Sequence, residues 1–154
     1  SRSGIVVKGL YDVAVHLSKC CSPVPGDEIV GYVTRGRGVS IHRTDCVNMI
    51  HLSEEEKVRL IDAEWQQGAD EGANGLYLAE LKIYGNNRTG LLVDISKIFT
   101  ERSIDIIGMH SKTSKQGIAT IEISFHVKGR EELVKLIDKI RQVESVIDIE
   151  RTAG

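Results

Sequence analysis

The stretch AVHLSKCCSPVPGDEIVGYVTRGRGVSIHRTDC occupies residues 14–46 and contains all three cysteines and both prolines of the chain. Residues 29–34 and 39–43 are rich in β-branched side chains and flank the sequence Arg-Gly-Arg-Gly, which predicts a β-hairpin with a tight turn. The Pro-Val-Pro-Gly segment at 23–26 cannot form a helix or a central strand, because proline lacks an amide donor. The stretch therefore predicts a cysteine-bearing loop joined directly to a hairpin.

The three cysteines and His42 carry the side-chain types that zinc prefers, thiolate and imidazole. Cys20 and Cys21 precede the hairpin, His42 lies at the end of its second strand, and Cys46 follows four residues later. A His-x3-Cys spacing suits tetrahedral zinc, although adjacent cysteines are not the usual pair, which is separated by two residues. Four such ligands would stabilise a domain with a small core.

Two other interpretations of the same residues stay open. The first is three reduced, partly buried thiols with His42 facing solvent. The second is a cysteine nucleophile at Cys21 or Cys46, with His42 near in sequence, but no activating base or oxyanion site is visible.

The hairpin carries Arg35, Arg37 and Arg43, and no acidic residue lies between Glu28 and Asp45. Guanidinium groups suit bidentate contact with phosphate, and a glycine-spaced turn lets them approach closely. Three charges provide only a modest electrostatic attraction, so a solvated basic turn is the alternative.

Composition sets limits on the class of protein. The chain has 154 residues, 41% of them hydrophobic, which predicts one modest domain or two small ones. A net charge of −2 excludes a general basic field toward nucleic acid or membrane. No apolar run approaches the ~20 residues of a membrane span, so we expect no membrane association.

An odd number of cysteines indicates the reducing cytoplasm. A start at Ser1 rather than Met indicates a fragment of a longer protein.

The chain divides at a polar, glycine-rich segment. QQGADEGANG at residues 66–75 has three glycines and no β-branched residue, which is typical of a linker. We therefore expect a first module at 1–67, a linker at 68–75 and a second domain at 76–154. In the first module, Asp45 is expected to cap a short helix through Leu52, and a capping box begins at Ser53. A strand at 58–65 completes this small α/β module.

The second domain switches between strand and helix periods. Residues 76–84, 104–111 and 119–127 read as strands, and 146–151 as the last strand. Two segments have apolar residues at helical spacing: Leu91, Leu92, Ile95, Ile98 and Phe99 in the first, and Leu133, Leu136, Ile137 and Ile140 in the second. The order βαββαβ predicts a ferredoxin-like sandwich with two helices on one face of an antiparallel sheet, and an α+β chain overall.

The segment CCSPVPGDEIVGYVTRGRGVSIHRTDC, residues 20–46, closely resembles the zinc-finger-like or intersubunit module of long RelA/SpoT-homologue enzymes, which make and break the alarmone (p)ppGpp. In that family an ACT domain follows this module and ends the protein. The βαββαβ order, with Gly90-Leu91 opening the first helix, resembles an ACT domain. The resemblance implies a regulatory C-terminal fragment of a bifunctional (p)ppGpp synthetase/hydrolase, a GTP pyrophosphokinase, whose catalytic domains are absent here. The alternative is an autonomous amino-acid-binding ACT sensor with a metal-stapled module.

The resemblance also implies partners. ACT domains commonly form dimers and bind amino acids between a loop and a facing strand, so we expect a homodimer and valine as the first ligand to try. That site would comprise Asn87, Arg88, Thr89, Gly90, Leu91 and Leu92, with Ile107 and Gly108 facing them. The family docks on ribosomal RNA, so Arg35, Arg37 and Arg43 are the expected RNA contacts.

No catalytic residue is expected in this chain. Its acidic residues are scattered, whereas (p)ppGpp chemistry needs a nucleotide pocket and clustered metal ligands. The remaining histidines have no partner at triad or ligand spacing; they are His16, His51, His110 and His126.

Overall fold

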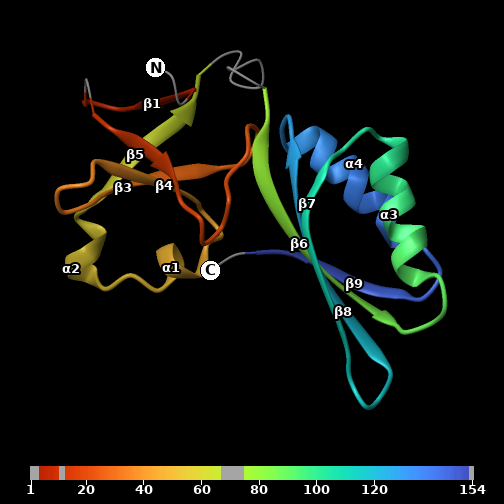
Figure 1. Ribbon diagram of the computed structural model, residues 1–154. Coiled ribbons are helices and arrows are strands. Elements are labelled where there is room, and N and C mark those ends of the chain that lie inside the picture. Colours follow the sequence, from red (N-terminus) through yellow and green to blue (C-terminus); the bar gives the residue numbers. More distant parts are fainter. Residues whose placement is uncertain (1–3, 11–12, 67–74, 153–154) are drawn as a thin grey trace.

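The computed structural model describes residues 4–10, 13–66 and 75–152, and within them the chain forms two sheets that lie side by side (Figure 1). Each sheet has its own hydrophobic core. The chain is therefore α+β, as predicted. The predicted linker at 68–75 lies outside the described residues, except for Gly75.

The first sheet has five strands in the order β1-β5-β3-β4-β2. The strands are β1 Ile5–Val7, β2 Val15–Leu17, β3 Ile29–Val33, β4 Val39–Arg43 and β5 Leu60–Trp65. The predicted hairpin is confirmed, since β3 pairs antiparallel with β4 from Ile29 opposite Arg43 to Val33 opposite Val39. Its turn places Gly36 and Gly38 at positive φ, which glycine adopts without strain. Four buried apolar residues form the core of this sheet: Ile5, Val7, Val39 and Ile41.

Two helices of four residues each, α1 Val47–Ile50 and α2 Glu54–Lys57, connect β4 to β5. The cap predicted at Asp45 is wrong: α1 begins after Cys46 and ends at Ile50, before Leu52. The Asp45 carboxylate instead accepts hydrogen bonds from the guanidinium of Arg43, at 2.9 and 2.7 Å. The capping box of α2 is confirmed, because Ser53 and Glu56 exchange side-chain and backbone hydrogen bonds.

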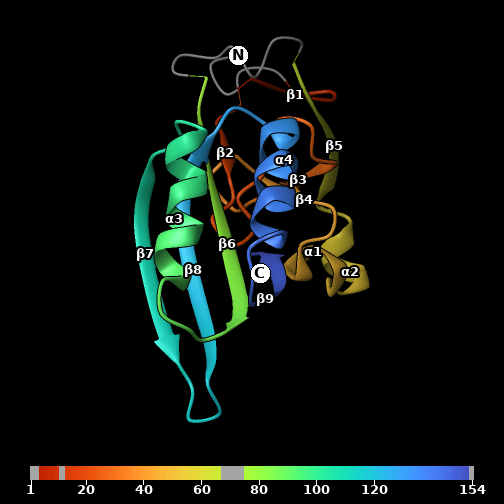
Figure 2. The ribbon, with the colours of Figure 1, turned by 90° about the vertical axis from the view of Figure 1, so that its right-hand side faces the viewer.

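The second domain has the predicted βαββαβ order. Its elements are β6 Tyr77–Asn86, α3 Leu91–Glu101, β7 Ile106–Thr113, β8 Ile118–Val127, α4 Arg130–Arg141 and β9 Val146–Arg151. The sheet is antiparallel with the order β7-β8-β6-β9. Figure 2 shows α3 and α4 side by side on one face of this sheet, and Figure 1 places the first module on its other side.

The core of the second domain follows the strand and helix periods of the sequence. Alternate residues of β6 and β8 are buried against residues one helical turn apart in α3 and α4. Phe99 of α3 meets Phe125 of β8 edge to face, with ring centroids 5.1 Å apart. Leu92 belongs to the predicted apolar set but is 39% exposed, because its position turns away from the stripe of Leu91, Ile95 and Phe99.

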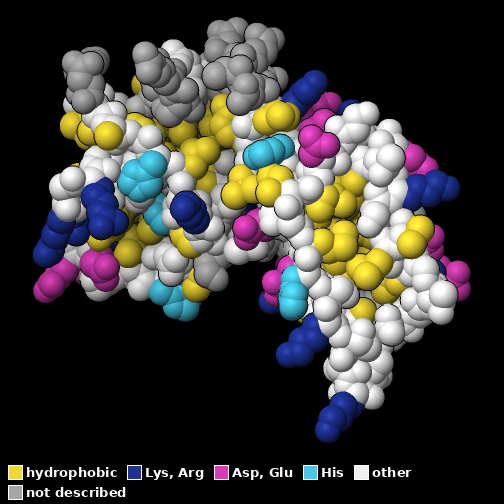
Figure 3. Space-filling view, viewed as in Figure 1, with side chains coloured by type: hydrophobic (Ala, Val, Ile, Leu, Met, Phe, Trp, Pro, Cys, Tyr) yellow, Lys and Arg dark blue, Asp and Glu magenta, His cyan; other side chains and the backbone are white. Residues whose placement is uncertain are grey.

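The two modules meet at the loop that precedes the hairpin. Val24 of this loop is fully buried within the core cluster of the second domain. Trp65 at the end of β5 packs edge to face on Tyr77 at the start of β6. Figure 3 shows the modules as two lobes with a hollow below this joint. None of the helices in the described residues is long and apolar enough to cross a membrane.

Candidate metal centre

A sharp turn brings the two adjacent cysteines to one point. Residues 19–21 form a turn directly after β2, and the amide of Ser22 donates to the carbonyl of Ser18 at 3.0 Å. Ser22 has a positive φ of 46°, a conformation that non-glycine residues adopt rarely. In this turn the sulfurs of Cys20 and Cys21 lie 4.0 Å apart. Adjacent cysteines can therefore converge here, although they lack the usual spacing of two residues.

The cysteine pair faces His42 and Cys46. The Cys20 sulfur lies 3.3 Å from His42 Nδ1 and 3.4 Å from the Cys46 sulfur, and the Cys21 sulfur lies 3.9 Å from His42 Nδ1. All four ligand atoms lie within 4.8 Å of one another. In tetrahedral zinc with Zn–S near 2.3 Å and Zn–N near 2.0 Å, neighbouring ligand atoms are about 3.5–3.8 Å apart. The four residues thus lie close together and could bind a metal ion.

His42 is held in the orientation that a metal ligand needs. Only 7% of the residue is exposed, so the interpretation in which it faces solvent is wrong. Its Nε2 lies 3.0 Å from the Ser40 hydroxyl, and that hydroxyl is 3.5 Å from the carbonyl of Tyr32. A hydroxyl that donates to a carbonyl accepts from Nε2–H, which leaves the Nδ1 lone pair directed at the sulfurs. Burial, followed by the charge of His16, lowers the pKa of His42 and favours the neutral, ligating form.

The thiols differ in their surroundings. Burial raises the pKa of Cys21 above its usual range, against the opposing effect of a hydrogen bond from the Arg43 amide. Burial is also the largest contribution that raises the pKa of Cys46. For Cys20 burial acts in the same direction, but hydrogen bonds with side chains, Ser18 first, leave its pKa lowered. A bound cation would offset the cost of holding buried thiolates, because metal ligation requires the deprotonated sulfur.

Arg43 does not belong to the exposed basic turn. It is 5% exposed, and one guanidinium nitrogen donates to the carbonyls of Cys21 and Thr152, both at 2.9 Å. The predicted RNA contact of Arg43 is therefore wrong, since its side chain lies inside the protein. Arg35 and Arg37 are exposed at the hairpin turn. The strand period offered a signal, because Arg43 shares a face with Val39 and Ile41.

The loop predicted to bind an amino acid joins β6 to α3. Gly90 precedes α3 with a φ of 83°, and the Asn87 amide donates to the Gly117 carbonyl. Arg88 is engaged within its own domain: it pairs with Asp94 at 2.8 Å and donates to the Glu144 carbonyl at 3.0 Å. It also donates to the Thr89 carbonyl, while Leu91 is buried and Leu92 is exposed.

Ile107 and Gly108 do not face this loop within one chain. Gly108 pairs with Ser124, and Ser124 pairs with Glu80. Glu80 precedes the end of β6 at Asn86 by six residues, which corresponds to about 20 Å along a strand. The prediction that these two parts face each other is therefore wrong for a single chain, and a site containing both requires a second copy.

Sequence reasoning missed one polar anchor between the modules. Asp27 is 8% exposed, and its two carboxylate oxygens accept from the guanidinium of Arg151 at 2.8 and 2.9 Å. An aspartate after Pro-Gly is typical of a turn, and only the fold brings the last strand to it.

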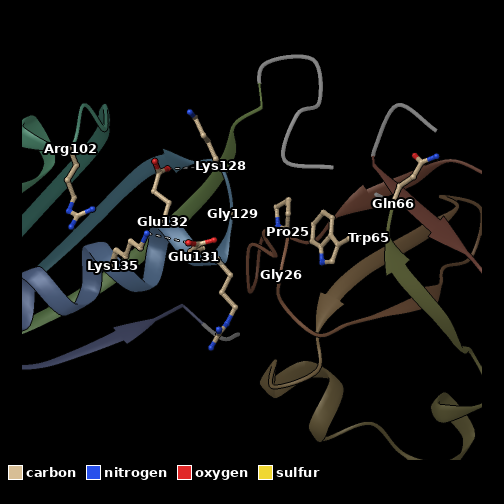
Figure 4. A pocket seen from close by; sticks show the side chains of 11 residues that line it. Pro25, Gly26, Trp65, Gln66, Arg102, Lys128, Gly129, Glu131, Glu132 and Lys135 are labelled. Carbon is tan, nitrogen blue, oxygen red and sulfur yellow. Dashed lines mark hydrogen bonds and ion pairs between the residues drawn. The ribbon is translucent and has the colours of Figure 1, made fainter. Parts of the chain in front are cut away.

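A pocket of about 610 Å³ lies at the same joint (Figure 4). Pro25 and Trp65 line it from the first module, and the first turn of α4 lines it from the second. Two of its carboxylates are already engaged: Glu131 pairs with Lys135 at 3.3 Å, and Glu132 accepts from the backbone amide of Lys128. The pocket therefore points to no particular ligand chemistry.

Comparison with known proteins matches both halves of the chain. The RelA/SpoT RIS domain family matches residues 5–66, and the ACT domain family matches residues 73–151. The GTP pyrophosphokinase of Escherichia coli K12 is 36% identical over 151 residues, which are 97% of this chain and 20% of that protein. The GTP pyrophosphokinase of Streptomyces coelicolor is 37% identical over 98% of this chain and 17% of its own length. The chain thus spans about a fifth of the length of these curated relatives.

Among solved structures, the ACT domain of the GTP pyrophosphokinase of Chlorobium tepidum is similar with a TM-score of 0.46 and 28% identity. The likeness covers 51% of this chain and 89% of that domain.

Proposed function

Because this chain belongs to the ACT domain family and joins that domain to a RelA/SpoT RIS domain, we propose that it is the C-terminal regulatory region of a (p)ppGpp synthetase/hydrolase. One observation carries the proposal: a match to GTP pyrophosphokinase that runs through both modules over 97% of this chain. Its role is to relay the state of the ribosome or of an amino-acid pool to catalytic domains elsewhere in the protein.

The proposed role is regulatory rather than catalytic. Among the described residues, one group of His, Cys, Asp or Glu has the spacing of a metal site, and it consists of three cysteines and a histidine. Pyrophosphoryl transfer uses magnesium held by oxygen ligands, which this buried sulfur-rich cluster does not offer. We expect no (p)ppGpp synthesis or hydrolysis by the isolated chain.

We propose zinc as the metal of the cluster. Three thiolates and one imidazole form a set typical of closed structural zinc sites. The residues that would hold zinc are Cys20, Cys21, His42 and Cys46, and their four positions leave no open site for substrate. Reduced cysteines of this kind also support a cytoplasmic location.

Three partners belong to the proposal. Arg35 and Arg37 are exposed on a glycine-spaced turn, which supports contact with ribosomal RNA. A homodimer is supported by the open edge of β7 and by the separation of Gly90 from Gly108, since a second copy would bring a facing strand. The ligand of such a shared site is proposed to be a branched-chain amino acid, with valine as the first candidate.

A chimera tests the regulatory role. The 151-residue segment of the Escherichia coli GTP pyrophosphokinase that matches this chain is replaced by it, and (p)ppGpp formation is measured with and without ribosomes. We expect the chimera to retain the ribosome dependence of the parent enzyme, and the isolated chain to form no product. The same chimera with Cys20→Ser and Cys46→Ser is the control that removes the metal centre. A chimera whose synthesis ignores ribosomes, beside a parent that responds, would contradict the proposal.

A further inference from the structure

The loop at residues 20–27 has two structural roles. Its first two residues, Cys20 and Cys21, belong to the candidate metal centre. Its last residues, from Val24 to Asp27, contact the ACT domain. We propose that metal binding at the cysteine cluster controls how firmly the ACT domain docks on the first module. This inference rests on the proposed metal site and adds to it a regulatory consequence.

The second half of the loop is built into the ACT domain. Val24 is fully buried in the hydrophobic core of that domain. The Pro25 carbonyl accepts from the amide of Arg130 at 2.7 Å and so binds the first residue of α4. A Cβ at Gly26 would lie 2.9 Å from Arg130 Cβ, so the backbones are in close contact. Displacing this half of the loop would therefore expose Val24 and leave the start of α4 without its carbonyl partner.

Asp27 joins the loop to the last strand of the ACT domain. Its carboxylate forms the two-pronged pair with Arg151 and also accepts from the Val24 amide at 2.8 Å. Arg151 in turn donates to the carbonyl of Ser22 at 3.3 Å, one residue after the ligand Cys21. A buried pair of this kind holds only while its geometry is intact, because separating the charges leaves each one desolvated.

Arg43 connects the metal centre to the same strand end. Its side chain donates to the carbonyl of Cys21 and to the carbonyl of Thr152 through one nitrogen, at 2.9 Å each. Its own amide donates to the Cys21 sulfur at 3.3 Å, and it directly follows the ligand His42. A shift of the Cys21 backbone would therefore disturb the guanidinium that also binds the end of the ACT domain.

The backbone is strained between the cysteine half of the loop and the half that contacts the ACT domain. Ser22 holds a left-handed φ of 46°, which a non-glycine residue keeps only when surrounding contacts impose it. A metal that binds Cys20 and Cys21 would impose it from one side, and the docked ACT domain imposes it from the other. Two events that stabilise the same loop conformation strengthen each other, and the effect is reciprocal.

If metal binding strengthens docking of the ACT domain, weaker docking must also weaken metal binding. This can be tested with every proposed metal ligand left in place. Zinc affinity is measured on the 154-residue chain by competition with a chromophoric chelator, for Asp27→Asn, for Arg151→Gln and for the unsubstituted protein. We expect both variants to bind zinc at least about fivefold more weakly, in the usual range of coupling between sites. Arg141→Gln is the matched control, because Arg141 is exposed at the end of α4 away from the loop, and its affinity should equal that of the unsubstituted chain.

Trp65 reports the opposite direction of the coupling. It is the single tryptophan of the chain, it packs on Tyr77 with centroids 5.7 Å apart, and its Nε1 donates to the Asp27 carbonyl. We expect removal of zinc by a chelator to move the Trp65 emission to longer wavelength, as the joint loosens and water reaches the indole. The Cys46→Ser variant should show that emission at the outset and should not respond to zinc.

The outcomes separate this inference from the proposed function. If the unsubstituted chain does not bind zinc, the proposed metal site fails and the inference fails with it. If zinc binds, but Asp27→Asn and Arg151→Gln match Arg141→Gln in affinity and Trp65 emission ignores the metal, the inference alone is overturned. Circular dichroism confirms that each variant is folded; should Arg151→Gln unfold, the near-isosteric Asp27→Asn decides the question.

Discussion

Ser40 and His42 lie on the same strand, two residues apart, and the Ser40 hydroxyl is 3.0 Å from His42 Nε2. Ser40 therefore orients the ring of the one histidine in the candidate metal centre. A metal-bound imidazole commonly relies on such an outer partner for its orientation. Ser40 has no metal-binding atom of its own in the cluster, so its contribution can be separated from ligation.

We expect Ser40→Ala to weaken zinc binding by about tenfold or more, the usual loss when the outer partner of a metal-bound histidine is removed. The measurement is zinc competition with a chromophoric chelator. Ser111→Ala, at an exposed position of β7 in the second domain, is the control and should leave the affinity unchanged. Equal affinities for Ser40→Ala and Ser111→Ala would show that Ser40 does not position His42.

Zinc should also stabilise the fold, because it binds the folded arrangement of four residues that the unfolded chain does not preserve. At a free concentration of about 100 times its dissociation constant, a ligand specific for the folded state adds about 2.7 kcal/mol. We expect zinc to raise the unfolding temperature of the chain and Cys46→Ser to abolish the rise. His51→Gln is the control, since His51 is exposed at the end of α1 outside the cluster. A zinc-dependent rise that survives in Cys46→Ser would place the metal elsewhere.

The second domain could be predicted from the sequence almost to its element boundaries, and the reason is physical. In β8, Ile121, Ile123 and Phe125 are buried while Glu122 faces outward. A shift of one residue would exchange the two faces, so the alternating pattern fixes both strand and register. The last strand, β9, was predicted with its observed bounds, Val146–Arg151.

The contact between the two modules and the burial of Arg43 could not be predicted from such a local pattern. Asp27 and Arg151 are 124 positions apart in sequence, and a local pattern carries no information about a contact at that distance. The sequence groups Arg43 with Arg35 and Arg37, because all three lie in a hairpin without acidic residues and guanidinium suits phosphate. Its burial depends on carbonyl groups supplied by the cysteine loop and by Thr152 of the other domain.

The hairpin arginines now separate into two groups with different expected phenotypes. Replacing Arg35 and Arg37 by alanine should weaken ribosome binding of the chain and reduce the salt dependence of its affinity, by up to about one in the slope for each lost phosphate contact. The unfolding temperature should not change, because both side chains are exposed. The measurement is ribosome co-sedimentation over a range of salt concentrations.

Arg43→Ala should affect the stability of the chain rather than its contact with RNA. It leaves the carbonyls of Cys21 and Thr152 without their donor, and a buried polar group left unpaired costs about 1–3 kcal/mol. We expect a lower unfolding temperature. At a temperature where the variant is folded, the salt slope of ribosome binding should be unaltered. An unchanged salt slope after loss of Arg35 and Arg37 would exclude the hairpin turn as an RNA contact.

The loop before α3 provides the last prediction, for the proposed amino-acid site. Gly90 has a φ of 83°, where an alanine is strained. We expect valine, at about 100 times its dissociation constant, to add about 2.7 kcal/mol to the stability of the chain, and Gly90→Ala to remove this effect. Gly36→Ala is the matched control, because Gly36 also has a φ of 85° and open space around its Cβ position but lies in the first module. Both variants should lose stability from backbone strain, and only Gly90→Ala should lose the response to valine. Because Gly90 lies beyond the end of β6 and Gly108 pairs near the other end of that sheet, the response should also require a dimer, which sedimentation detects. A valine response of a monomer would place the ligand elsewhere.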